Sequence, residues 1–106
     1  ILSVPFLAHI HADPFDFQRW TYFKLKSELE KLNFKIHFFE INGRFFTVFS
    51  EMKRYFSMSL PFGLRHLAYL SFPFLDFLTK LDNLDFVKNH KIFGNFHGGY
   101  FIIAKK

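Results

Sequence analysis

Hydrophobic residues recur along this chain with two spacings, and the alternation of these spacings most constrains the fold. A spacing of two residues is typical of a strand with one buried face, whereas spacings of three and four are typical of a helix. Helices are predicted over Phe15–Asn33, from Phe45 to Phe56 and from Pro73 to Leu84. Strands are predicted over Ser3–Ile10, Phe34–Ile41, Leu64–Phe72, Lys91–Phe93 and Tyr100–Ile103.

This order, β-α-β-α-β-α-β-β, indicates a small α/β domain. Helices that alternate with strands pack on one sheet, and crossovers join parallel strand pairs. We therefore expect a mixed β-sheet with about three helices packed on it, and a final hairpin that adds an antiparallel edge. The predicted buried residues of the helices are Tyr22, Leu25, Leu29 and Leu32, then Phe45, Val48, Phe49, Met52 and Phe56, then Phe74, Phe77, Leu78, Leu81 and Leu84.

Local residue choices predict where the elements begin and end. Asp13 and Pro14 are typical of a helix start, because Asp caps the first turn and Pro needs no amide proton there. Asn33 can end that helix. The pair Asn42–Gly43 predicts a turn before the second helix.

The nineteen phenylalanines are too many to be buried in the core of so short a chain. The chain has 106 residues, one domain's length, and Phe outnumbers its 13 Leu. A domain of this size has few interior positions, so some Phe must be exposed and covered by a partner. We interpret the excess as the codon bias of an AT-rich organellar genome, because Phe, Tyr, Met, Ile, Asn and Lys greatly outnumber Gly, Ala, Arg and Pro. The alternative is a ligand cavity lined by Phe.

The net charge of +5 favours an acidic partner. We expect nucleic acid first and an anionic membrane surface second. No membrane span is expected, because the longest stretches without charged residues, Ile1–Ala12 and Ile92–Ala104, are shorter than the ~18 residues that a span requires. The absence of Cys excludes disulfides and thiolate zinc sites.

Two motifs raise the question of catalysis. His9, His11 and Asp13 would share one face of a strand and could converge on a metal. We expect Asp13 to cap a helix instead, and we predict no metal and no cofactor. The segment Gly94–Gly99 lacks the Lys-Ser/Thr pair of a phosphate loop and is interpreted as a turn. No nucleophile, base and orienting group share a recognisable spacing, so no enzymatic activity is predicted.

Basic residues on the predicted helices are the better candidates for function. Arg19, Lys24 and Lys26 would lie on the exposed side of the first helix, and Arg44, Lys53 and Arg54 on the second. Lys and Arg bind the phosphates of nucleic acids irrespective of the base sequence. Trp20 could stack on an unpaired base or belong to the core. The alternative for all these charges is an ordinary solvated surface.

Several segments follow one another in a characteristic order. They are Ile10–Trp20 between a strand and a helix, Leu25–Asn33, Asn42, Gly63–Phe72, and Asn89–Ile102 with its paired glycines. Together they resemble the large-subunit ribosomal protein ten family, the base of the ribosomal stalk, over nearly the whole chain. Glu30, Ile41 and Leu64 depart from the family's pattern, its Gly-Leu-Thr turn is not reproduced, and one residue is inserted in the second strand.

The resemblance implies a structural component of the mitochondrial ribosome. Residues 1–106 would form a single domain that anchors the stalk base to ribosomal RNA, near the translation-factor binding centre and beside ribosomal protein eleven. Lys26 and Asn42 stand at RNA-contact positions of the family, and charge and position add Arg19, Lys24 and Arg44. In the family a C-terminal helix carries dimers of the acidic stalk protein. This chain stops at Lys105–Lys106, about where the globular part ends, so we expect that helix to be absent, encoded elsewhere or outside this sequence.

Three alternatives stay open from the sequence. The first is another mitoribosomal protein of α/β fold that docks elsewhere on the ribosome. The second is a membrane-associated subunit of an organellar complex. The third is a metalloenzyme that uses His9, His11 and Asp13.

Overall fold

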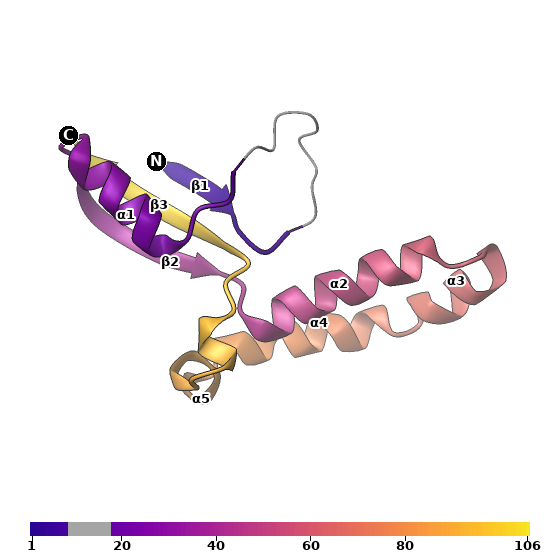
Figure 1. Cartoon of the computed structure of the whole chain (residues 1–106). Helices are drawn as coiled ribbons and strands as arrows, with labels where there is room; N and C mark the ends of the chain where they lie inside the picture. The colour runs from indigo at the N-terminus through magenta and orange to yellow at the C-terminus, as the bar shows by residue number, and fades with distance from the viewer. Residues whose placement is uncertain (9–17) are drawn as a thin grey trace. The chain divides into compact units, whose positions relative to one another are not determined.

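The computed structural model describes residues 1–8 and 18–106, and within them the chain forms two compact units (Figure 1). The sheet unit consists of the described residues up to Asn42 together with His97–Lys106. The helical unit consists of Gly43–Phe96. Helices and strands are both present, and the predicted α/β class is confirmed.

The sheet unit holds the three strands of the sheet and one helix. The strands are β1 (Leu2–Pro5), β2 (Lys35–Asn42) and β3 (Gly99–Lys105), and α1 spans Tyr22–Lys31. The strand order is β1-β3-β2, and β3 is antiparallel to both neighbours. The sheet was predicted to be mixed, with parallel strand pairs. This prediction is wrong, because both strand pairs of the described sheet are antiparallel. The last strand lies between the first two, so β1 and β2 run in the same direction without pairing.

The core of the sheet unit lies between α1 and one face of the sheet. Leu25 of α1 and Tyr100 and Ile102 of β3 are almost fully buried. Half-buried side chains complete the cluster; they are Val4, Phe6, Trp20, Tyr22, Leu29, Ile36, Phe39, Ile41 and Ala104. Burial raises the pKa of the Tyr100 phenol above its usual value. Trp20 thus belongs to the core, one of its two predicted roles.

A bulge in β2 changes which side chains face this core. The pairing with β3 shifts between Ile36 and Phe38, which leaves His37 without a place in the register. Because a strand alternates its faces at every residue, one extra residue inverts the pattern beyond it. Ile36 and Phe39 therefore both face α1, whereas Phe38 lies on the opposite face. The simple alternation predicted for Phe34, Ile36 and Phe38 is wrong after the bulge.

Helix α1 begins later than predicted and ends where predicted. Thr21 is its N-cap, and the hydroxyl oxygen accepts a hydrogen bond from the Lys24 amide. Residues 18–20 are not helical, so the predicted start at Phe15 is wrong for them, and the Asp13–Pro14 start lies outside the described residues. Asn33 has a left-handed backbone, and the amides of Asn33 and Phe34 donate to Glu30 and Leu29, which closes the helix.

The helical unit contains four α-helices and two short 3₁₀ turns. The helices are α2 (Phe45–Ser59), α3 (Phe62–Tyr69), α4 (Phe72–Lys80) and α5 (Asp85–Asn89), and the turns are Leu81–Asn83 and Phe93–Asn95. The strand predicted over Leu64–Phe72 is wrong, because α3 and the start of α4 occupy it. Leu64, Leu67 and Ala68 also have helical spacing, and a short apolar run does not distinguish the two periods.

The short strand predicted over Lys91–Phe93 is also wrong. The imidazole Nδ1 of His90 accepts hydrogen bonds from the amides of Ile92 and Phe93, at 3.2 and 3.4 Å. A side chain that satisfies these amides locally replaces a strand ladder. The Gly94 amide then donates to the His90 carbonyl, and the segment turns instead of extending.

A buried carboxylate fixes the start of α2. Asp82 accepts hydrogen bonds from the amides of Arg44, Phe46 and Thr47 at 2.8 to 3.0 Å. It satisfies donors that the first turn of a helix leaves free, and its negative charge lies at the positive end of the helix dipole. Gly43 precedes this turn with φ of 71°, and a Cβ there would lie 2.6 Å from the Thr47 Cγ2.

Few of the predicted helix faces in this unit are buried. Helix α2 packs against α4. Val48 of α2 and Leu75 of α4 are almost fully buried, and the buried Ser50 hydroxyl donates to the Leu75 carbonyl at 3.2 Å. The exposed residues that were predicted as buried are Phe49, Met52, Phe56, Phe74, Phe77 and Leu84, and Leu32 of α1 is exposed as well.

Candidate nucleic-acid interface

The predicted RNA-binding residues divide between the two units. Four belong to the sheet unit, namely Arg19, Lys24, Lys26 and Asn42. Three belong to the helical unit, namely Arg44, Lys53 and Arg54.

Arg19 does not lie on a helix, contrary to the prediction. It precedes the Thr21 cap and is half-buried. Its guanidinium donates to the carbonyls of Phe6 and Ala8 at 3.2 and 3.3 Å. Arg19 therefore holds the chain that follows β1, which is a structural task.

The lysines of α1 are paired with carboxylates of the same helix. Lys24 and Lys31 both contact Glu28, at 2.6 and 3.0 Å, and they lower the pKa of its carboxyl, Lys24 first and Lys31 second. Lys26 lies 3.9 Å from Glu30. These exposed pairs contribute little to stability, but they reduce the charge that α1 presents.

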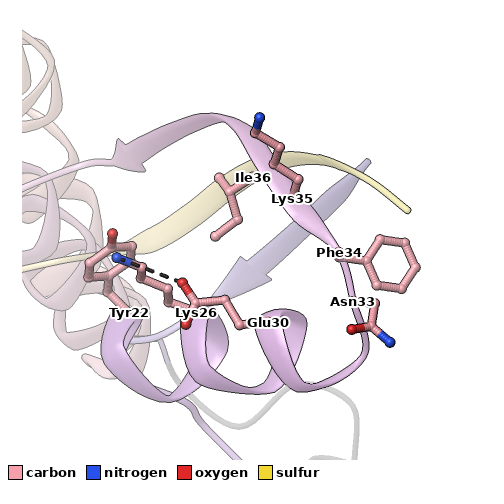
Figure 2. A pocket seen from close by; sticks show the side chains of 7 residues that line it. All are labelled: Tyr22, Lys26, Glu30, Asn33, Phe34, Lys35 and Ile36. Carbon is pink, nitrogen blue, oxygen red and sulfur yellow. Dashed lines mark ion pairs between the residues drawn. The ribbon is translucent and has the colours of Figure 1, made fainter.

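A groove runs between α1 and the start of β2 (Figure 2). Its volume is about 560 Å³, and it is lined by Tyr22, Lys26, Glu30, Asn33, Phe34, Lys35 and Ile36. Figure 2 shows the Ile36 side chain pointing towards α1, whereas that of Lys35 points away from it. The groove combines the Tyr22 and Phe34 rings with Lys26, whose ammonium lies 3.9 Å from a Glu30 carboxylate oxygen.

A cluster of three lysines lies beside this groove. Lys35 and Lys105 are partners in the β2–β3 register, and the Lys106 ammonium lies 6.0 Å from the centre of the Phe34 ring. Among the described residues, no Asp or Glu forms an ion pair with any of these three lysines. We name Lys35, Lys105 and Lys106 the lysine end of the sheet.

The lysine end was not among the predicted RNA-binding residues. Lys35 is separated in the sequence from the two terminal lysines, and only the antiparallel pairing of β2 with β3 brings them together. Knowing that register would have been enough to find the cluster.

Asn42 lies at the other end of β2. It is exposed and pairs in the register with Gly99, whose Cβ position is blocked by the Val4 carbonyl at 2.7 Å. Alternation from Phe38 and Glu40 places Asn42 on the face of the sheet that is opposite to α1.

In the helical unit, two of the three predicted cations are tied to the protein itself. The Arg44 guanidinium donates to the Gly94 carbonyl at 3.1 Å. Arg54 forms an ion pair with Asp76 and lies over the Phe72 ring. The Lys53 ammonium lies 5.6 Å from the centre of the Phe56 ring, at the surface. Lys53 is therefore the most available cation of this set.

Within residues 1–8 and 18–106, no three His, Asp or Glu side chains are grouped so that they could hold a metal ion. His9, His11 and Asp13 lie outside this range. In the same part of the chain, no helix has the length and apolar character to cross a bilayer.

Comparison with known proteins gives no relative. No family model, no curated protein and no solved structure matches this chain.

Proposed function

We propose that this protein is a structural, RNA-binding component of the large subunit of the mitochondrial ribosome, and that it anchors the stalk base to ribosomal RNA. The ribosomal assignment is supported by the resemblance of the sequence to the protein ten family, in segments that follow one another from Ile10 to Ile102. The excess of amino acids with AT-rich codons supports the mitochondrial location. The proposal includes no catalytic step and no cofactor.

The observation that carries the RNA-binding part is the lysine end beside the aromatic groove. Seven Lys and Arg stand against three Glu among the described residues of the sheet unit. The α1 pairs neutralise part of this excess, so the remaining charge is concentrated at Lys35, Lys105 and Lys106. A positive patch next to half-buried rings attracts phosphates and offers surfaces for bases.

The helical unit supports a second contact, with neighbouring ribosomal proteins. Helix α3 has no buried residue, and the apolar side chains of Phe62, Leu67 and the C-cap Leu70 are each about two-thirds to four-fifths exposed. Its Arg65 is half-buried, and the guanidinium Nε donates to the Leu60 carbonyl at 3.3 Å. A helix with its apolar side outward gains stability when a partner covers it. By the family resemblance, ribosomal protein eleven and the acidic stalk protein are the partners to test.

Sedimentation of the native protein tests the proposal. In a gradient of lysed mitochondria at moderate salt, we expect the chain to migrate with the large subunit. It should leave the particle progressively as salt is raised, because phosphate contacts release counterions on binding. Migration at the top of the gradient at all salt concentrations would contradict the proposal.

A membrane-associated role is the second candidate. From Met52 to Leu75 the sequence has no Asp or Glu, and α3 exposes apolar residues next to His66. Such a surface fits an anionic bilayer. Flotation with vesicles of phosphatidylcholine and cardiolipin separates the two candidates, since the ribosomal role predicts no flotation and the membrane role predicts flotation that the substitution Leu67→Glu abolishes.

A further inference from the structure

We propose that the open face of the β-sheet is a binding platform for single-stranded RNA, on which bases stack against Phe38 and Phe101. This inference rests on the proposed RNA-binding function and names the strand conformation that the protein recognises. It concerns the face of the sheet that points away from α1.

The register defines this face. Beyond the bulge, Phe38 pairs with Ile103, Glu40 pairs with Phe101, and these four side chains point away from α1. Their register neighbours Phe39 and Ile102 point towards it. The open face is therefore built from two neighbouring strands, with Ser3 of β1 beside Phe101.

The aromatic side chains on this face are placed for stacking. The rings of Phe38 and Phe101 contact each other edge to face, with centroids 6.1 Å apart and planes 69° from parallel. Phe38 is 46% exposed and Ile103 is 38% exposed. Keeping apolar rings at the surface costs free energy in water, and an RNA base recovers it by stacking.

The charges on this face complement a nucleic-acid strand. Lys35 and Lys105 lie at one end, where they can contact phosphates. Glu40 lies midway; it repels phosphate but accepts a hydrogen bond from the amino group of a base. Asn42 lies at the far end, about 23 Å from Lys35 at ~3.3 Å per residue, and its amide can bond to a base edge. An RNA strand could therefore cross the open face with its phosphates at the lysine end and its bases over Phe38 and Phe101.

An RNA strand is favoured over a duplex on geometric grounds. Stacking on a protein ring requires a base that is free of its own stack, and the bases of a duplex are not. A platform of Phe38, Phe101 and Ile103 therefore discriminates against double-stranded RNA, whereas lysines alone bind both forms.

The test measures binding of the full chain to two probes, hexacytidine and a short RNA duplex, by fluorescence anisotropy. We expect Phe38→Ala and Phe101→Ala each to weaken hexacytidine binding about five- to hundredfold, the loss that accompanies one stacked base. Duplex binding should change less than twofold. The control is Phe23→Ala on α1, which removes a ring that is 79% exposed and should leave both affinities unchanged.

A second pair of variants, Phe38→Leu and Phe101→Leu, keeps the face apolar and protects the fold while removing the rings. They should show the same selective loss, with an unchanged circular dichroism spectrum. Unchanged hexacytidine binding in the Leu variants would overturn the platform while leaving RNA binding by the lysine end intact. Binding of cardiolipin vesicles through Phe38 and Phe101, in place of hexacytidine, would overturn it too. Failure of the unmodified chain to bind either RNA would refute the proposed function itself.

Discussion

The two units contain similar residues and bury them very differently. Both are rich in Phe and Leu, yet fourteen of the large hydrophobic side chains exposed among the described residues belong to the helical unit and six to the sheet unit. In the sheet unit, α1 covers one face of three strands, and Leu25, Tyr100 and Ile102 close a core. In the helical unit, α2 packs against α4, and the buried apolar side chains are Val48, Leu75 and Val87. Apolar content therefore does not decide burial; the presence of a second covering layer does.

The difference suggests a division of labour. The sheet unit has its own core and can hold cations and rings in fixed positions for RNA. The helical unit presents apolar surface that a neighbour would cover. Each prediction below separates a residue that stabilises one unit from a residue that serves a partner.

The largest effect is expected at two adjacent isoleucines of β3. Ile102→Ala removes an almost fully buried side chain, and we expect it to lower the free energy of unfolding by about 2–5 kcal/mol. Ile103→Ala removes a side chain from the open face and should cost less than about 1 kcal/mol. Urea unfolding of the two variants makes the comparison. Equal losses would mean that the open face is packed as tightly as the core.

The next effect is expected at the carboxylate that caps α2. Asp82→Ala leaves three amides of the first turn without their acceptor, and we expect a loss of about 1–3 kcal/mol. Asp85→Ala, an exposed residue three positions on, is the control and should stay within about 0.5 kcal/mol. Thermal unfolding measures both. A loss at Asp85 equal to that at Asp82 would refute the capping role.

A still smaller effect is expected at the outer side of α3. Leu67→Gln and Leu70→Gln replace exposed apolar side chains, so the free energy of unfolding should change by less than about 0.5 kcal/mol. Binding to the ribosomal particle should weaken, because the covered apolar surface is lost. A large loss of stability with unchanged particle binding would show that α3 is packed within the protein and has no partner.

The smallest change in stability is expected at Glu28, but its effect on binding is informative. Lys24 and Lys31 hold the pKa of its carboxyl below the usual value, so its small contribution to stability is present above the unfolded pKa and is lost as the pH falls through the folded one. Glu28→Gln removes that contribution and releases both lysines. RNA affinity should rise only as much as in Glu51→Gln, a variant of α2 with the same change in net charge, because α1 lies on the face of the sheet opposite to the proposed RNA platform. A larger rise for Glu28→Gln than for this control would show that α1 faces RNA.

Much of the sheet unit could be predicted from the sequence, and much of the helical unit could not. The existence of a strand within Phe34–Ile41, the helix stop at Asn33 and the strand at Tyr100–Ile103 are local signals, and each is confirmed. The bulge at His37 was missed because a register shift depends on the partner strand. The β1-β3-β2 order was missed because the crossover rule assumes that successive strands pair in parallel.

In the helical unit the error has one physical source. Periodicity shows which residues share a face, but not whether that face is covered. Phe49, Met52 and Phe56 do share one side of α2, as predicted, and that side is exposed. Among the candidate site residues, Lys26 and Asn42 lie near the groove and on the open face, whereas Arg19, Arg44 and Arg54 hold the fold together. The sequence alone does not distinguish a Lys or Arg that bonds to a carbonyl of the protein from one that is available to bind phosphate.

The salt dependence of RNA affinity tests the central assignment most directly. The triple variant Lys35→Gln, Lys105→Gln, Lys106→Gln removes the lysine end, and Lys80→Gln, Lys88→Gln, Lys91→Gln removes the same charge from exposed positions of the helical unit. Each lost phosphate contact reduces the slope of log affinity against log salt by about 0.7–0.9. We predict a reduction of about 2 for the first variant and less than about 0.5 for the second. Equal slopes for both variants would contradict an RNA site at the lysine end of the sheet.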